Sequence, residues 1–170
     1  MPDGDITVEI TGVSDVVRAL ESMKLRIDAA TRQATVKSGQ TLQSKAVSNF
    51  RGTHAPGEWH VGGDSPNTVT GNLQRSITAW PVVHQGIGRY SIQVNPTAIY
   101  SRVIELGATI TPKDKEFLSW IGVRADGSVG RIYKREVTVP PYPYFRPATK
   151  STTLVMRTIY SSYWTTAVNG

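Results

Sequence analysis

The stretch Ile99–Ile110, IYSRVIELGATI, decides the fold that we predict for this chain. Ile99, Val103 and Leu106 are spaced i, i+4 and i+7, which predicts a short helix with one apolar face. Gly107 suits the residue that ends such a helix, and the β-favouring residues after it predict a short strand. The stretch therefore predicts a two-turn helix, a glycine stop and a strand.

Glu105 stands among these apolar residues, two positions before the glycine. A carboxylate near a helix C-terminus gains nothing from the helix dipole. Two interpretations stay open at this point. Glu105 either has a specific partner, such as an arginine of this chain or of a neighbouring subunit, or it is an ordinary solvated glutamate.

The length of 170 residues suits a single domain over 1–170, and no repeat or linker divides the chain. The absence of cysteine excludes disulfides, thiolate nucleophiles and cysteine metal sites. No run of about 18 apolar residues predicts a membrane span, and the N-terminus is too polar for a signal peptide. We therefore expect a soluble protein made in the cytoplasm, with no membrane partner.

The net charge is +6 and the pI is near 9.7, but the charge is uneven. Residues 1–12 carry −3, whereas 13–51 and 113–150 each carry +4. This balance permits contact with nucleic acid or with an acidic protein surface. No dense run of lysine and arginine demands such contact.

In the first part of the chain, Ile6, Val8 and Ile10 alternate with polar residues and predict a strand. A first helix is expected to begin after Gly12 and to end near Met23. A second, longer helix is expected over 25–50. Its narrow apolar stripe would leave one side on a sheet and the other facing water or another subunit.

Residues 51–69 contain four glycines and two prolines, so we predict a flexible loop there. His54, Glu58 and His60 lie in this loop. They lack the rigid spacing of real metal sites, so we predict no metal site.

After the loop, the sequence predicts a capped helical turn from Thr70 and a strand from Ile77 to His84. Pro81 would place that strand at an edge or create a bulge. A hairpin partner is expected around 90–94. Residues 113–136 predict a second hairpin, inserted between the other elements, whose returning strand would run from Arg131 to Val139.

The segment 140–145 combines prolines with three aromatic residues and must be extended. Its aromatic residues could bind a partner groove or stacked bases, but we favour a role in anchoring the last helix. That helix would start near Pro147 and pack through Leu154, Val155, Ile159 and Tyr163. The fold class is therefore α+β, with a long N-terminal helix and a C-terminal helix packed on a small, mostly antiparallel sheet.

No known catalytic motif is present: there is no GxSxG, P-loop, HExxH or dinucleotide fingerprint. We therefore predict that the protein is not an enzyme and holds no cofactor.

Three segments together resemble a known family: TGNLQRSI at 70–77, YSRVIELGATITPK at 100–113 and VTVPPYPYFRPA at 137–148. They resemble the tail-completion and head–tail joining proteins of long-tailed bacteriophages, also described as minor tail components. The resemblance covers about residues 12–165. The matching residues are Thr70, Gly71, Leu73, Ser76, Ile77, Tyr100, Ile104, Glu105, Gly107, Pro141, Pro143, Tyr144, Phe145, Arg146, Pro147 and Ala148. The sequence departs from the family at 106–108, where members commonly have an aromatic residue before the glycine and threonine after it.

The resemblance implies a structural protein of the virion that forms a ring, typically of six copies, at the head–tail junction. Its partners would be other copies of itself and the adjacent neck proteins, with phage DNA in the lumen as a further candidate. In such a ring, the basic long helix would meet an acidic patch of the neighbour, and our hypothesis places that patch in 1–12. Alternatives are a tail terminator, a head-side adaptor or stopper, or a basic DNA-binding accessory protein.

Overall fold

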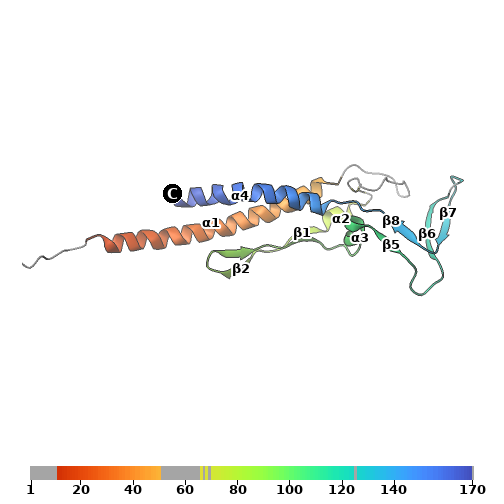
Figure 1. The fold of residues 1–170 in the computed structure, drawn as a ribbon, viewed down its shortest axis with the longest axis horizontal. Helices are drawn as coiled ribbons and strands as arrows, with labels where there is room; N and C mark the ends of the chain where they lie inside the picture. Colours follow the sequence, from red (N-terminus) through yellow and green to blue (C-terminus); the bar gives the residue numbers. More distant parts are fainter. Residues whose placement is uncertain (1–10, 51–65, 67, 69, 125, 170) are drawn as a thin grey trace, which may run out of the picture.

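The computed structural model describes residues 11–50, 66, 68, 70–124 and 126–169. Two long helices, α1 (Val13–Ser48) and α4 (Phe145–Asn169), lie side by side in opposite directions (Figure 1). Small two-stranded antiparallel sheets and two short helices complete the elongated molecule. The predicted α+β class is confirmed.

α1 is one continuous helix, so the predicted break near Met23 is wrong. Neither glycine nor proline occurs between Gly12 and Gly39, and nothing local interrupts the helix there. Gly12 precedes the helix with a positive φ of 83°. The strand predicted around Ile6–Ile10 lies outside the described residues.

α4 packs against a strip of small residues on α1, which lets the two helices approach closely. The buried members of this strip are Ala30, Thr31, Ala34, Thr35 and Ser38. The Thr35 hydroxyl hydrogen-bonds the Tyr160 hydroxyl at 2.8 Å, and the Trp164 indole N–H donates to the Thr31 hydroxyl at 3.0 Å. The predicted apolar side of the last helix needs one correction: Leu154 is 80% exposed, because Thr152 and Ala148 face the core instead.

The first hairpin is divided in two. β1 (Ile77–Ala79) pairs with β4 (Val94–Pro96), and β2 (Val83–Gly86) pairs with β3 (Arg89–Ser91). The single strand predicted over 77–84 is interrupted after Ala79 because Pro81 cannot donate to the ladder. Gly39 on α1 leaves room for Ile92 of this hairpin, which a β-carbon at that position would strike.

The remaining elements follow the predicted order. α2 (Asn72–Arg75) precedes β1, and α3 (Ser101–Leu106) is followed by β5 (Ala108–Ile110). β6 (Leu118–Val123) and β7 (Val129–Lys134) form the second hairpin within 113–136, and β8 (Val137–Val139) pairs with β5. The returning strand predicted over 131–139 is thus split at 135–136, and its halves pair with different strands. The loop predicted over 51–69 lies outside the described residues, except for Pro66 and Thr68.

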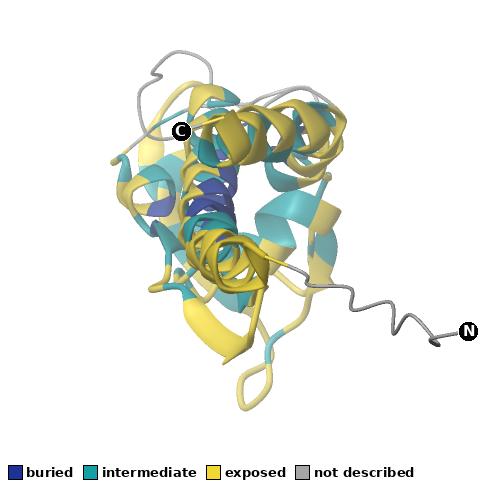
Figure 2. Ribbon diagram, turned by 90° about the vertical axis from the view of Figure 1, so that its left-hand side faces the viewer, coloured by how far each residue is buried: buried dark blue, intermediate teal, exposed yellow. Residues whose placement is uncertain are grey.

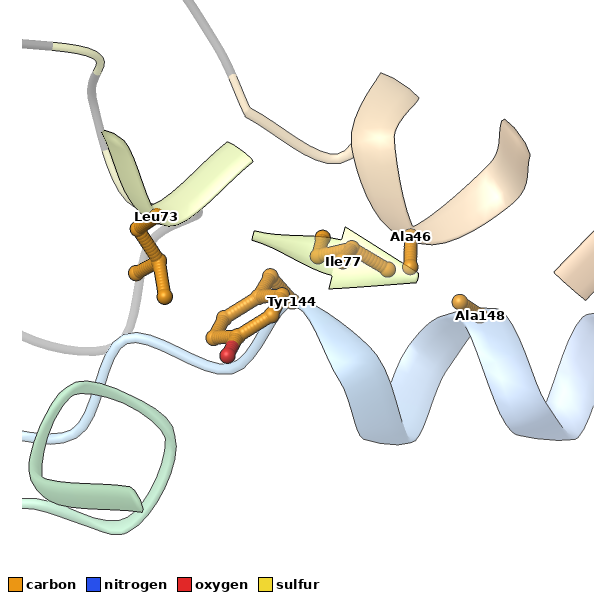
Figure 3. Close-up of a cluster of buried hydrophobic side chains, with 5 residues drawn as sticks. All are labelled: Ala46, Leu73, Ile77, Tyr144 and Ala148. Carbon is orange, nitrogen blue, oxygen red and sulfur yellow. The ribbon is translucent and has the colours of Figure 1, made fainter. Parts of the chain in front are cut away.

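The hydrophobic core is small and lies where the C-terminal end of α1 meets the start of α4. Its members are Ala46, Leu73, Ile77, Tyr144 and Ala148 (Figure 3). Seen along the long axis, the buried residues form one narrow zone and the outer turns of the helices are exposed (Figure 2).

The apolar face predicted for α3 is not buried in this chain. Ile99 is 98% exposed and Leu106 is also exposed, whereas Ile104 packs against the core. The helix begins only at Ser101, so Ile99 precedes it and cannot share its face.

Candidate functional site

The three sequence segments that carry the family resemblance meet in one place, which we call the junction. It comprises the core residues Ala46, Leu73, Ile77, Tyr144 and Ala148 together with Glu105. The first segment supplies Leu73 and Ile77, the second supplies Glu105, and the third supplies Tyr144 and Ala148.

Glu105 has specific partners, and they are backbone N–H groups rather than the side chain of an arginine. Its Oε2 atom accepts hydrogen bonds from the backbone N–H groups of Tyr144, at 2.8 Å, and Phe145, at 2.9 Å. Its Oε1 atom accepts a third hydrogen bond from the backbone N–H of Arg146 at 2.9 Å. The carboxylate of α3 therefore caps the N-terminus of α4, where a negative charge is also favoured by the helix dipole.

This cap leaves no unpaired donor in the first turn of α4. A helix begins with four N–H groups that lack partners inside the helix. Counted from Tyr144, the residue before the helix, Glu105 binds the first three of these groups, and the fourth position is Pro147, which has no N–H. The prediction that Pro147 stands in the first turn of the last helix is confirmed.

Tyr144 is the centre of the core, with no exposed surface. Its ring lies 4.9 Å from the ring of Phe50 and 6.4 Å from that of Phe145, measured between centroids. The pKa of the Tyr144 hydroxyl is raised to about 12, mainly by burial and next by the nearby Glu105 charge, against a smaller lowering by the Ser101 hydroxyl. Tyr144 therefore anchors α4 to the core, as the sequence analysis favoured.

Gly107 brings the backbone of α3 against the segment before α4. It has a φ of 71° and a ψ of 163°, a conformation that is almost restricted to glycine. A β-carbon there would lie 2.8 Å from the Val139 carbonyl oxygen and 2.9 Å from the Pro141 nitrogen. Beside it, the Tyr142 N–H donates to the Ile104 carbonyl oxygen at 2.7 Å.

The first segment contributes packing and a turn. Gly71 precedes α2 with a φ of 72°, and the Ser76 hydroxyl donates to the Leu73 carbonyl oxygen at 2.7 Å. The Thr70 hydroxyl accepts a long hydrogen bond, of 3.4 Å, from the Asn72 N–H, and Gly71 rather than Thr70 occupies the cap position. Of the other matching residues, Tyr100 and Arg146 are exposed, and Pro143 is half-buried.

Sequence reasoning missed the contribution of α1 to the junction. Asn49 donates its side-chain N–H to the Tyr144 carbonyl oxygen at 2.6 Å, and Gln43 donates to the Ile77 carbonyl oxygen at 2.8 Å. An asparagine or glutamine near the end of a long helix does not by itself indicate such a contact, because side-chain amides at these positions are often exposed.

A second link joins α1 to the first hairpin. Asp28 accepts hydrogen bonds from the Tyr90 hydroxyl, at 2.6 Å, and from the Gly88 N–H, at 2.8 Å. These two bonds lower the pKa of Asp28, and the bond between Asp28 and the Tyr90 hydroxyl raises the pKa of Tyr90. The contact is exposed and fixes the β2–β3 turn against the side of α1.

Away from the junction, much of the apolar surface is uncovered. Among the described residues, seven hydrophobic residues are buried, whereas twenty large hydrophobic residues are exposed. Single exposed hydrophobic residues are ordinary, but sets that share one face indicate a binding surface. One such set lies on the first turns of α1, and another on the β6–β7 hairpin.

No group of three or more histidine and acidic side chains is close enough to hold a metal within the described ranges. The metal site considered at His54, Glu58 and His60 falls outside them. A groove of about 450 Å³ between α1 and α4 is lined by small and polar residues, with Arg26 and Tyr163 as its ionisable groups. No helix in the described part of the chain is long and apolar enough to cross a membrane.

Comparison with known proteins finds no family model, no curated protein and no solved structure that matches this chain.

Proposed function

We propose that this chain is a structural subunit of the neck of a long-tailed bacteriophage, where it forms a ring at the head–tail junction of the virion. The observation that carries the proposal is the convergence of the three resembling segments at the junction. Glu105, from the second segment, caps the helix that the third segment begins. Leu73 and Ile77, from the first, pack with Tyr144 and Ala148.

This convergence supports the resemblance because it gives most motif positions a physical reason. The glutamate accepts three backbone hydrogen bonds, the glycine two residues later avoids a clash, and the proline occupies a position without a free N–H. Three short matches scattered over unrelated surfaces would have no such explanation. Tyr100 and Arg146 have exposed side chains that are available for partner contacts.

A role in assembly is supported by the uncovered apolar surface. A chain that buries so few hydrophobic side chains by itself reaches a normal degree of burial when it binds other subunits. The resemblance implies about six copies in the ring, with neighbouring neck proteins above and below it. The protein has no enzymatic role in this proposal.

The test uses tails of the phage that encodes the chain, prepared without this protein. Native mass spectrometry measures the purified chain alone and after addition of these tails. We expect the chain to bind the tails as a ring and to restore their joining to filled heads. A chain that binds neither tails nor heads would contradict the proposal.

A salt series separates the proposed role from that of a DNA-binding accessory protein. Binding through phosphate contacts weakens with salt, with a log–log slope of about −0.9 for each contact. Tight, steeply salt-dependent binding to duplex DNA without binding to tails would favour the accessory role.

A further inference from the structure

Two exposed apolar surfaces lie at opposite ends of the molecule. The first, which we call the overhang, is the part of α1 over 13–22, where every residue is exposed. The second is one face of the β6–β7 hairpin. The overhang lies at one end of the long axis and the hairpin at the other (Figure 1).

The overhang carries its apolar residues in a single stripe. Val13, Val16, Val17 and Leu20 are spaced i, i+3, i+4 and i+7, which places them on one side of the helix. All four are exposed, since α4 ends beside Arg26 and does not reach them. Such a stripe is the usual packing surface of an amphipathic helix, and no element among the described residues covers it here.

The hairpin carries a complementary face. Residues directly opposite one another in an antiparallel pair point to the same side, so Ile121 shares a face with Arg131, and Val123 with Val129. Tyr133 belongs to the same face. Its large apolar side chains are exposed, with Ile121 at 72%.

The opposite face of the hairpin is already occupied by its own side chains. Trp120 lies over Gly122, where a β-carbon would come within 3.0 Å of the indole nitrogen and of Ile132. A two-stranded hairpin is marginally stable in water unless a further strand or a helix packs on it. The exposed face is therefore the one available for such packing.

Each surface contains a charge that lacks a partner among the described residues. Glu21 borders the stripe on the overhang, and Arg131 stands in the middle of the hairpin face. Neither makes an ion pair within the described part of the chain. Opposite charges set in two apolar surfaces favour one contact in one orientation.

The two surfaces of one chain cannot meet. The 36 residues of α1 give it a length of about 54 Å, and the hairpin lies beyond its far end. A contact between them must therefore join two copies.

We propose that the overhang of one copy packs on the exposed face of the β6–β7 hairpin of the next copy, with Glu21 against Arg131. Because the two surfaces differ, the association is head-to-tail and can close into a ring. This inference deepens the proposed function, on which it rests for the ring itself, by naming the surfaces that bind.

Crosslinking tests the contact directly, because the chain has no cysteine and the introduced thiols are the only ones present. A variant with both Leu20→Cys and Ile121→Cys is treated with a short thiol–thiol crosslinker, alone and in the presence of tails. We expect a ladder of dimers, trimers and larger species. The matched control combines Leu20→Cys with Ile87→Cys, an equally exposed isoleucine in the turn of the other hairpin, at 76%. Crosslinking no greater than in this control, both alone and on tails, would overturn the inference.

Charge reversal tests the orientation. Glu21→Arg alone and Arg131→Glu alone should each weaken self-association about tenfold, and the double variant should restore it. Circular dichroism should be unchanged in all three, because both side chains are exposed. A double variant as weak as the single variants would overturn the pairing of Glu21 with Arg131.

These outcomes are independent of the test of the proposed function. A crosslinked ladder from a chain that never binds tails would keep the contact and contradict the neck role. Rings on tails without the crosslink would keep the neck role and overturn the contact.

Discussion

At the junction, Tyr144 and Ala148 have almost no exposed surface, whereas at the two ends of the long axis Val16 and Ile121 are 60% and 72% exposed. The difference extends to polar groups. The first turn of α4 has all its N–H groups paired, but Glu21 and Arg131 at the ends have no ion-pair partner among the described residues. The junction thus completes its interactions within the chain, whereas the two ends do not, and the contact that we propose between copies would complete them.

Among the substitutions at the junction, Gly107→Ala should have the largest effect on stability. The new β-carbon would meet backbone atoms of 139–141 in a conformation that alanine resists, so we expect a loss of about 3 kcal/mol or more in the free energy of unfolding. Urea unfolding of the purified chain measures it. Gly127→Ala in the β6–β7 turn is the control. Gly127 also has a positive φ, of 81°, but an added β-carbon there has no neighbour within 4 Å, so we expect a loss of about 1 kcal/mol. Equal losses at both positions would contradict the close packing at Gly107.

Removing the cap should have the next largest effect. Glu105→Ala leaves three N–H groups of α4 without their acceptor, so we expect a loss of about 2–3 kcal/mol in stability. Glu116→Ala breaks an exposed ion pair with Arg135 and should cost less than about 0.5 kcal/mol. The two variants are compared by urea unfolding. If Glu105→Ala is as mild as the control, the cap contributes nothing to stability.

Alkaline pH should affect the junction through Tyr144. The folded-state pKa of about 12 lies above the ordinary tyrosine value of about 10. The stabilisation from its neutral hydroxyl is therefore complete below pH of about 10 and is lost as the pH rises through about 12. Relative to Tyr144→Phe, the wild-type chain should lose about 2 kcal/mol over this range. Tyr133→Phe, at an exposed position, is the control and should follow the wild type. Parallel pH curves for wild type and Tyr144→Phe would contradict the burial of the hydroxyl.

The smallest effect concerns the exposed link between Asp28 and the first hairpin. Its two hydrogen bonds lower the pKa of Asp28, so their contribution is present at neutral pH and is lost as the pH falls below about 4. Asp28→Asn should abolish this acid dependence. Hydrogen exchange at the Gly88 amide measures it, with the Trp80 amide, bonded to the Gln93 carbonyl oxygen, as an internal reference. Acid-dependent exchange at Gly88 that persists in Asp28→Asn would assign the effect to another group.

The sequence predicted those parts of the fold that depend on neighbouring residues. The glycine stop at Gly107, the hairpin turns and the start of α4 near Pro147 all follow from backbone preferences of a few residues. The sequence pattern underestimates the length of α1, because the valines and serines near its start predict a separate short helix.

The partner of Glu105 could not be predicted in the same way. Its donors are backbone N–H groups about 40 residues later in the chain, and every residue except proline carries such a group. The sequence therefore indicates that the Glu105 carboxylate is unusual, but it does not show which groups the carboxylate binds. Likewise, the apolar spacing over 99–106 signals a surface to be covered without revealing whether the same chain covers it, and Ile99 stays exposed.

The length of α1 also has a mechanical consequence. The helix is held at one end by the junction and along its middle by α4, while its first turns project freely. Over a rod of about 54 Å, a tilt of about 5° at the held end displaces the far tip by about 5 Å. In the proposed ring, a slight adjustment at the junction would change how far apart adjacent copies stand, and α1 would act as a lever that converts local repacking into a change of ring diameter.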